Sequence, residues 1–136
     1  MPSYPRLFQS LAVGRHVLPN RLVIPAIGTN FADSQGKVTA RLTEYYAARS
    51  ASRPGLMVVE ATCVHPSGRV IANHLMNADL SALPGLSRLA RAAKGDGQGL
   101  ALIQLIHGGR NSLPGPNGEV LAPSALRGPT SRLTPR

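Results

Sequence analysis

The stretch from Leu100 to Arg110, LALIQLIHGGR, limits the possible folds more than any other part of the chain. From Leu100 to Ile106 every residue except Gln104 is aliphatic, and a turn with two glycines follows. Such a run predicts a parallel strand covered on both faces, because a half-exposed strand would alternate apolar and polar residues. Gln104 would then be a buried amide near the carboxyl end of the strand. It is either satisfied by neighbouring groups or available to a ligand, and the sequence leaves both interpretations open.

The chain begins with short apolar segments separated by turn residues. The segments Leu11–Val13 and His16–Leu18 flank Gly14-Arg15, which predicts a β-hairpin in which glycine supplies a positive φ angle. Arg21–Ile24 then predicts a short strand. Pro25 ends that strand, because proline has no N–H group for the ladder of hydrogen bonds.

Two helices separate this strand from the later ones. Thr39 is expected to cap a helix that runs to about Ser50, and Ser81 is expected to cap a second helix that ends at Gly95. Between these helices, Leu56–Glu60 predicts a second buried strand. Strands joined by single helices pair in parallel through right-handed crossovers. The chain is therefore expected to have an α/β fold with three parallel strands after the hairpin.

Polar or glycine-containing segments follow all three expected strands. They are Pro25–Gly28, Glu60–Thr62, and Gln104 with His107–Arg110. Neither GxGxxG nor GxxxxGK[ST] occurs, so the phosphate-binding motifs of open α/β sheets are missing. Functional groups at the carboxyl ends of successive parallel strands are typical of a (β/α) barrel. Three strands, however, are few for a closed barrel.

Composition excludes several classes of function. The 136 residues are 43% hydrophobic, which suits one modest globular domain. The net charge of +9 could attract nucleic acid, but the arginines are spread along the chain and aromatic residues are few, so we do not expect a nucleic-acid partner. No apolar run is long enough to span a membrane, and the start lacks the pattern of a signal peptide. These features favour a cytoplasmic protein.

The single cysteine and the loop histidines give no sign of a metal or disulfide site. Cys63 has no partner for an internal disulfide, which also favours the cytoplasm, and it is expected to be a small buried residue. His65 and His74 have no partner at metal-ligand spacing, so we expect surface positions for both and no bound metal.

Five segments, in this order, resemble one known family. They are LFQSLAVGRHVLPNRLVIPA, GKVTARLTEYYAARS, GLMVVEATCVHPSGR, QLIHGGR and APSALRGP. From Leu7 to about Pro135 the chain resembles the Old Yellow Enzyme-like NADH:flavin oxidoreductases, most closely the branch of 2,4-dienoyl-CoA reductase and trimethylamine dehydrogenase. The resemblance implies a flavin-binding (β/α)8 TIM barrel. Residues 1–136 would form its amino-terminal portion, an incomplete barrel made of the closing hairpin and about three β/α units.

The resemblance also assigns a cofactor and its contacts. It implies FMN as the cofactor and NADH or NADPH as the electron donor. The FMN-binding residues would be Pro25, Ala26, Ile27 and Gly28 beside the isoalloxazine ring, Ala61 through its backbone, and Gln104 at the pyrimidine edge. His107 and Arg110 would shape the mouth of the site, and no catalytic residue can be assigned.

Two departures from the family pattern bear on function. Gly28 stands where many relatives have a Thr, Cys or His side chain that touches the flavin. The family's substrate-binding His/His or His/Asn pair, its proton-donating Tyr and its phosphate-binding strands have no counterpart here. We therefore expect part of an FMN-dependent NAD(P)H oxidoreductase that acts on an activated C=C bond, inactive as an isolated chain. A second chain or self-association would complete its barrel. The alternative is a non-catalytic truncated fragment or assembly module, and the substrate and oligomeric state stay open.

Overall fold

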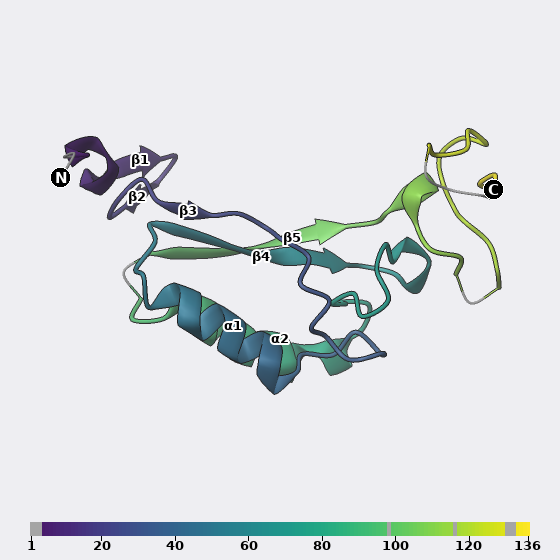
Figure 1. Cartoon of the computed structure of the whole chain (residues 1–136), viewed down its shortest axis with the longest axis horizontal. Coiled ribbons are helices and arrows are strands. Elements are labelled where there is room, and N and C mark those ends of the chain that lie inside the picture. Colours follow the sequence, from purple (N-terminus) through teal and green to yellow (C-terminus); the bar gives the residue numbers. More distant parts are fainter. Residues whose placement is uncertain (1–3, 98, 116, 130–132) are drawn as a thin grey trace.

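A computed structural model describes residues 4–97, 99–115, 117–129 and 133–136. Its strands and helices follow the expected order (Figure 1): β1 Leu11–Val13, β2 His16–Leu18, β3 Val23–Ile24, α1 Ala40–Ser50, β4 Leu56–Cys63, α2 Leu83–Lys94 and β5 Leu100–Ile106. Short 3-10 turns lie at Pro5–Phe8, Pro66–Gly68, Leu80–Ala82 and Gly109–Asn111. Within the described residues, no helix has both the length and the apolar character needed to cross a membrane.

The main sheet has three parallel strands in the order β3-β4-β5, as the alternation of strands and helices predicts. Met57 of β4 pairs with both Ile24 of β3 and Ala101 of β5, which fixes the register across the sheet. Both helices lie on the same side of this sheet (Figure 1). The opposite side has no helix in the described part of the chain, so the sheet is covered on one face only.

The predicted hairpin is confirmed. β1 and β2 pair antiparallel, with Val13 opposite His16, and Gly14 in the turn has a φ angle of 56°. The two strands form a separate sheet beside the amino-terminal ends of β4 and β5 (Figure 1). The hairpin therefore lies at the opposite end of the sheet from the carboxyl ends, where the candidate site residues were expected.

The two helices differ in how they begin. Thr39 caps α1 as predicted, because its hydroxyl accepts a hydrogen bond from the Leu42 N–H at 3.1 Å. The prediction that Ser81 caps the second helix is wrong, since α2 begins at Leu83 without a side-chain cap. The Ser81 hydroxyl instead donates to the Asp79 carboxylate and accepts from the Lys37 ammonium group, so it is already engaged.

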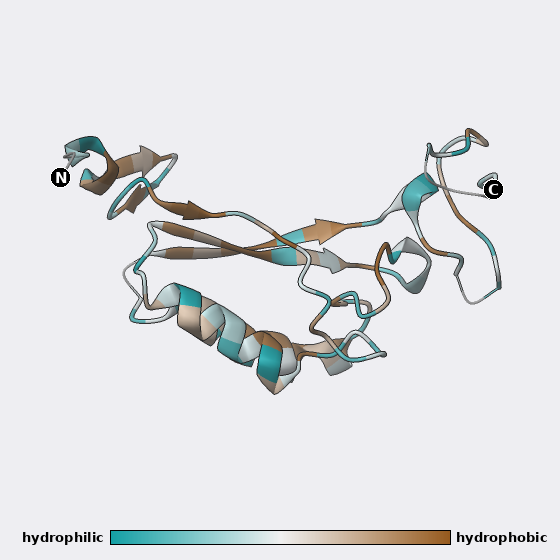
Figure 2. Ribbon diagram, in the orientation of Figure 1, coloured by the Kyte–Doolittle hydropathy of each residue, from teal (hydrophilic) through white to brown (hydrophobic). Residues whose placement is uncertain are grey.

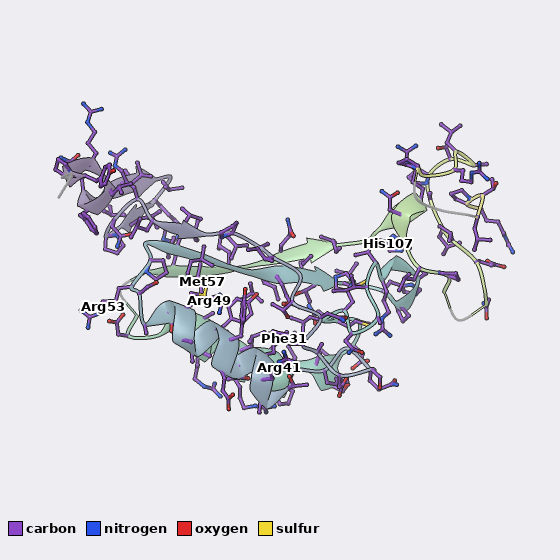
Figure 3. All side chains as sticks on the ribbon, viewed as in Figure 1. Phe31, Arg41, Arg49, Arg53, Met57 and His107 are labelled. Carbon is purple, nitrogen blue, oxygen red and sulfur yellow. The ribbon has the colours of Figure 1, made fainter. Side chains whose placement is uncertain are left out.

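The hydrophobic core lies between the helices and the sheet. Its buried members come from both layers and from the loops beside them: Ala32, Leu42, Tyr46, Met57, Val59, Leu75, Leu89 and Ala93. Figure 3 shows Met57 between β4 and α1, where its side chain is 1% exposed. Phe31, Tyr45 and Tyr46 extend this core through edge-to-face ring contacts, so the two tyrosines act as packing residues.

Two expectations about the strands need correction. The second strand does not end at Glu60 but continues to Cys63, with a bulge between Val59 and Thr62. The third strand forms as predicted but is not covered on both faces, because Leu102 is 53% exposed and Leu105 is 54% exposed. Figure 2 shows this strand, at the edge of the sheet, as mostly hydrophobic with one hydrophilic band. Among the described strands, β4 alone pairs with it, and its apolar side chains stay accessible.

Candidate functional site

The register of the sheet brings the three expected site segments to the same end. Pro25–Gly28 directly follows β3, whereas Ala61 and Gln104 lie within β4 and β5. Val59 pairs with Ile103 and Thr62 pairs with Leu105, so Ala61 and Gln104 lie at the same level in neighbouring strands. All of these residues therefore meet near the carboxyl edge of the sheet, where parallel α/β folds place their ligand sites.

Gln104 lies on the open face of the sheet. Ala101 packs against the core between the helices and the sheet, and successive residues of a strand point to opposite faces, so Gln104 projects away from the helices. Its side chain is exposed and makes no hydrogen bond to any residue that the structure describes. The expectation of a buried amide is therefore wrong, because no described segment covers this face. An amide in this position can still both donate and accept hydrogen bonds.

The segment after β3 is held from beneath by a buried carboxyl group. The backbone N–H of Thr29 donates to Oε2 of Glu60 at 3.1 Å, and the Glu60 side chain is 0% exposed. Its other oxygen, Oε1, has no partner among the described residues. Burial raises the pKa of Glu60 above its ordinary value, with the hydrogen bond from Thr29 opposing that rise. Glu60 thus anchors the loop that begins at Pro25.

Tyr46 of α1 completes the support of this part of β4. Its hydroxyl oxygen accepts a hydrogen bond from the backbone N–H of Glu60 at 2.7 Å. Burial raises the pKa of Tyr46, so the phenol stays protonated. The helix layer therefore binds the backbone of β4 at the bulge, directly before Ala61.

Ala61 is fixed from the other side by His74. The Nε2 atom of His74 lies 2.8 Å from the carbonyl oxygen of Ala61, and Nδ1 accepts from the Val70 N–H at 3.2 Å. The His74 side chain is only 1% exposed, so the expected surface position is wrong. Burial lowers its pKa below the ordinary value and favours the neutral ring. The loop packs His74 against the strand because both ring nitrogens find backbone partners there.

A second cluster of polar side chains joins the loops after β4 and β5. The hydroxyl of Ser67 lies 2.7 Å from Nδ1 of His65 and 3.0 Å from Nε2 of His107. His107 Nδ1 accepts from the Gly109 N–H, so Nε2 carries the proton and donates to Ser67, which in turn donates to His65. His65 is exposed as expected, and Figure 3 shows His107 beyond the carboxyl end of β5.

Sequence reasoning missed Ser67 and the roles of Thr29 and His74. No periodic pattern marks them, because each lies in a loop and binds a residue distant in the sequence. The one available signal was Glu60, a carboxylate inside an otherwise apolar strand, which needs a partner when it is buried. Arg110 is exposed at the same end of the sheet, and nothing in its contacts assigns it a role.

Cys63 is buried, as expected, and its thiol donates to the carbonyl oxygen of His65 at 2.9 Å. Among the described residues, no three His, Cys, Asp or Glu side chains come together in a way that could hold a metal ion. The groups that the site does offer are an exposed amide at Gln104, backbone held by hydrogen bonds at Thr29 and Ala61, and apolar surface. Ile27 is 55% exposed and Leu102 is 53% exposed. This combination suits a flat ligand with hydrogen-bonding groups along one edge.

Comparison with known proteins agrees with this description. The sequence model of the NADH:flavin oxidoreductase / NADH oxidase family matches residues 6–127. The NADH oxidase of Thermoanaerobacter brockii is 35% identical over 116 residues, which is 85% of this chain and 18% of that protein. An NADPH dehydrogenase of Clostridium acetobutylicum is 33% identical over 131 residues, which is 96% of this chain and 38% of that protein.

Solved structures extend the likeness to three dimensions. A complex of 2-naphthoyl-CoA reductase with 2-naphthoyl-CoA superposes with a TM-score of 0.86 and 27% identity, over 98% of this chain and 22% of the other. Morphinone reductase with tetrahydroNAD gives a TM-score of 0.81 and 27% identity, over 94% of this chain and 35% of the other. The neighbours are TIM-barrel enzymes of the Old Yellow Enzyme type, so the expected fold, part of a TIM barrel, is confirmed.

The match is broad along this chain but covers a smaller part of each relative. The chain spans between 18% and 38% of the length of the two curated relatives described above, and corresponds to their amino-terminal portion. Members of the family use FMN together with NADH or NADPH. The finer assignment to the branch of 2,4-dienoyl-CoA reductase and trimethylamine dehydrogenase stays a prediction. From the family match and the structural likeness together, the chain belongs to the NADH:flavin oxidoreductase / NADH oxidase family.

Proposed function

We propose that this chain forms part of the FMN site of an NAD(P)H-dependent oxidoreductase. The cradle would consist of Pro25, Ala26, Ile27 and Gly28, the backbone of Ala61, and the side chain of Gln104. The observation that carries this proposal is the unpartnered amide of Gln104, level with Ala61 at the carboxyl edge of the sheet. A group in that position is available to a ligand and has no structural partner among the described residues.

The residues present fit the chemistry of a flavin. The pyrimidine edge of the isoalloxazine ring presents donors and acceptors side by side, and an amide side chain can satisfy both kinds of group. The flat apolar part of the ring suits exposed aliphatic side chains such as Ile27 and Leu102. The backbone of Gly28 has open space beside it for the ring. A Cβ atom added there would meet Ile71 Cδ1 at 3.5 Å, which is an ordinary contact distance.

FMN and the residues of this chain would have different roles. When bound, FMN supplies hydride transfer between NADH or NADPH and a substrate, for which an activated C=C bond is the class we propose. The residues of this chain would bind and orient the ring: Gln104 at its edge, and the segments at Gly28 and Ala61 against its surface. Glu60 and Tyr46 hold those backbone segments in place.

We also infer that further β/α units complete the site. The open face of β5 exposes Leu102, and in the described part of the chain β4 is the single strand that pairs with it. An apolar strand at a sheet edge tends to pair with another strand, and a barrel removes such edges by closing. We propose that a second chain or another copy of this one can supply such units. The cytoplasmic location stays a prediction, and no membrane or nucleic-acid partner is proposed.

The test is the visible absorbance spectrum of the purified chain with its mass in solution, before and after adding FMN. A bound-flavin spectrum that saturates with FMN would support the proposal. Gln104→Ala should then weaken FMN binding by roughly tenfold, the usual effect of a lost hydrogen bond to a ligand. Gln9→Ala, an exposed glutamine near the hairpin, is the matched control and should bind as the unmodified chain does.

Two outcomes would contradict the proposal. A folded chain that leaves the FMN spectrum unchanged at every oligomeric state would favour a non-catalytic fragment or assembly module. Binding that is equally strong in Gln104→Ala and Gln9→Ala would instead show that the flavin lies elsewhere. The mass in solution shows whether the chain self-associates, so a lack of FMN binding can be told apart from a lack of self-association.

A further inference from the structure

His74 is a buried imidazole with a fixed tautomer. Its side chain is 1% exposed, and the Val70 N–H donates to Nδ1 at 3.2 Å. A ring nitrogen that accepts a hydrogen bond carries no proton, so the proton of the neutral ring is on Nε2. Nε2–H then donates to the carbonyl oxygen of Ala61 at 2.8 Å. Both hydrogen bonds go to backbone groups, which determines how the ring is oriented.

The Ala61 carbonyl lies where the regular ladder of β4 is interrupted. β4 and β5 pair in register up to Val59 and again from Thr62, with a bulge between these residues. A bulge leaves an extra residue without its ladder partner and turns the local backbone. A carbonyl in such a segment needs another donor if it is to keep one orientation. His74 supplies that donor from outside the sheet.

The loop holds His74 beside the bulge through a short parallel bridge. Cys63, the last residue of β4, donates from its N–H to the Leu75 carbonyl at 2.8 Å and accepts from the Asn77 N–H at 2.8 Å. This bridge pairs Cys63 with Met76 and places the residues around Leu75 along the edge of β4. The position of His74 relative to Ala61 is thus set by backbone hydrogen bonds on both sides.

We propose that His74 is a positioning residue for the flavin, which acts by fixing the peptide group of Ala61 in the orientation that meets the isoalloxazine ring. This inference rests on the proposed function, because it needs FMN against Ala61. Packing alone does not require an imidazole, since an apolar side chain would fill a buried position without the cost of burying two polar nitrogens. What an apolar side chain could not supply is the donor to the Ala61 carbonyl.

Two substitutions at the same residue separate the two hydrogen bonds. In His74→Gln the side-chain NH2 group can reach the position of Nε2 and donate to Ala61, whereas the acceptor for Val70 is lost. In His74→Asn the shorter side chain keeps an acceptor near Nδ1 for Val70 but cannot reach Ala61. Both variants lose one hydrogen bond and packing volume, so a merely structural role predicts similar effects from the two. His16→Asn, an exposed histidine of the hairpin, is the matched control.

The readouts are the dissociation constant of FMN, the midpoint potential of the bound flavin and the thermal unfolding of the chain without FMN. We expect both variants to unfold at lower temperature than the unmodified chain. Only His74→Asn should weaken FMN binding, by roughly tenfold, and shift the flavin potential, whereas His74→Gln should bind within about threefold of the unmodified chain. His16→Asn should leave all three readouts unchanged.

Several results would overturn the proposal. If both variants keep the affinity and potential of the unmodified chain, His74 does not act on the flavin, although the proposed function stands. If both change them equally, the role of His74 is structural. If the unmodified chain binds no FMN, the proposed function fails and the inference fails with it.

A measurement on the unmodified chain covers the case in which His74→Asn does not fold. With 15N-labelled histidine, the Nε2–H signal of His74 should exchange slowly and shift when FMN is added, since its acceptor Ala61 meets the ring. The exposed His16 is the internal control and should not shift. A His74 signal that FMN leaves unchanged while the flavin is bound would contradict the proposal.

Discussion

The strands β4 and β5 have the same kind of sequence but different surroundings. Both are nearly continuous aliphatic runs, and they pair in parallel along most of their length. In β4, Met57 is 1% exposed and Val59 is 4% exposed, whereas in β5 Leu102 is 53% exposed and Leu105 is 54% exposed. β4 has a strand on each side and both helices beneath it, while β5 has one neighbour among the described strands. An apolar run therefore predicts that a strand forms, and its neighbours determine how much of it is buried.

The largest effect on stability should come from shortening a side chain of the buried strand β4. Met57→Ala should lower the free energy of unfolding by about 2–5 kcal/mol, because it removes buried atoms and leaves a cavity between β4 and α1. Leu102→Ala, the matched change on β5, should lower it by less than about 1 kcal/mol, because that side chain is already half exposed. Chemical denaturation of both variants is the measurement. Equal losses would mean that β5 is buried in solution, for example by self-association.

The limits of sequence reasoning follow from the same comparison. Local patterns predicted the hairpin at Gly14, the cap at Thr39 and all three strands, because turn chemistry, capping and apolar runs depend on neighbours in the sequence. Burial of Gln104 and exposure of His74 were predicted wrongly, since each depends on segments distant in the chain. Gln104 is exposed in the described structure, and His74 is buried against the distant strand β4, where Nε2 lies 2.8 Å from the carbonyl oxygen of Ala61. The candidate cradle was named from the family resemblance, and its contact with FMN stays a prediction.

A smaller effect should separate the polar residues of the two strands. Glu60 and Gln104 lie nearly level in the sheet, but Glu60 is 0% exposed and accepts from Thr29. Glu60→Ala leaves that N–H without its acceptor and should cost about 1–3 kcal/mol of stability. Gln104→Ala removes a side chain without a partner and should change stability by no more than about 0.5 kcal/mol. Denaturation curves of the two variants without FMN measure these changes. A comparable loss of stability in both would contradict the difference in burial between Glu60 and Gln104.

The pH dependence of stability should show the burial of Glu60 directly. Burial raises its pKa in the folded chain above the ordinary value of 4.5, so the folded state holds the proton more tightly than the unfolded state does. The stabilisation is then complete below about pH 4.5 and is lost as the pH rises through the folded pKa. Glu60→Gln stays neutral and lacks this dependence. The stability of the unmodified chain relative to Glu60→Gln should therefore fall with rising pH, and parallel curves would contradict a raised pKa for Glu60.

The smallest change in stability should come from making β5 more polar. Leu105→Thr introduces a β-branched residue, which suits a strand, and should alter the free energy of unfolding by no more than about 0.5 kcal/mol, because Leu105 is 54% exposed. Val59→Thr on β4 places a hydroxyl at a position that is 4% exposed and should cost about 1–3 kcal/mol. Sedimentation should also show less self-association in Leu105→Thr, since an apolar sheet edge promotes pairing between chains. If association is unchanged while stability is retained, the contact between copies lies away from β5, and the completing β/α units would have to be sought on another surface.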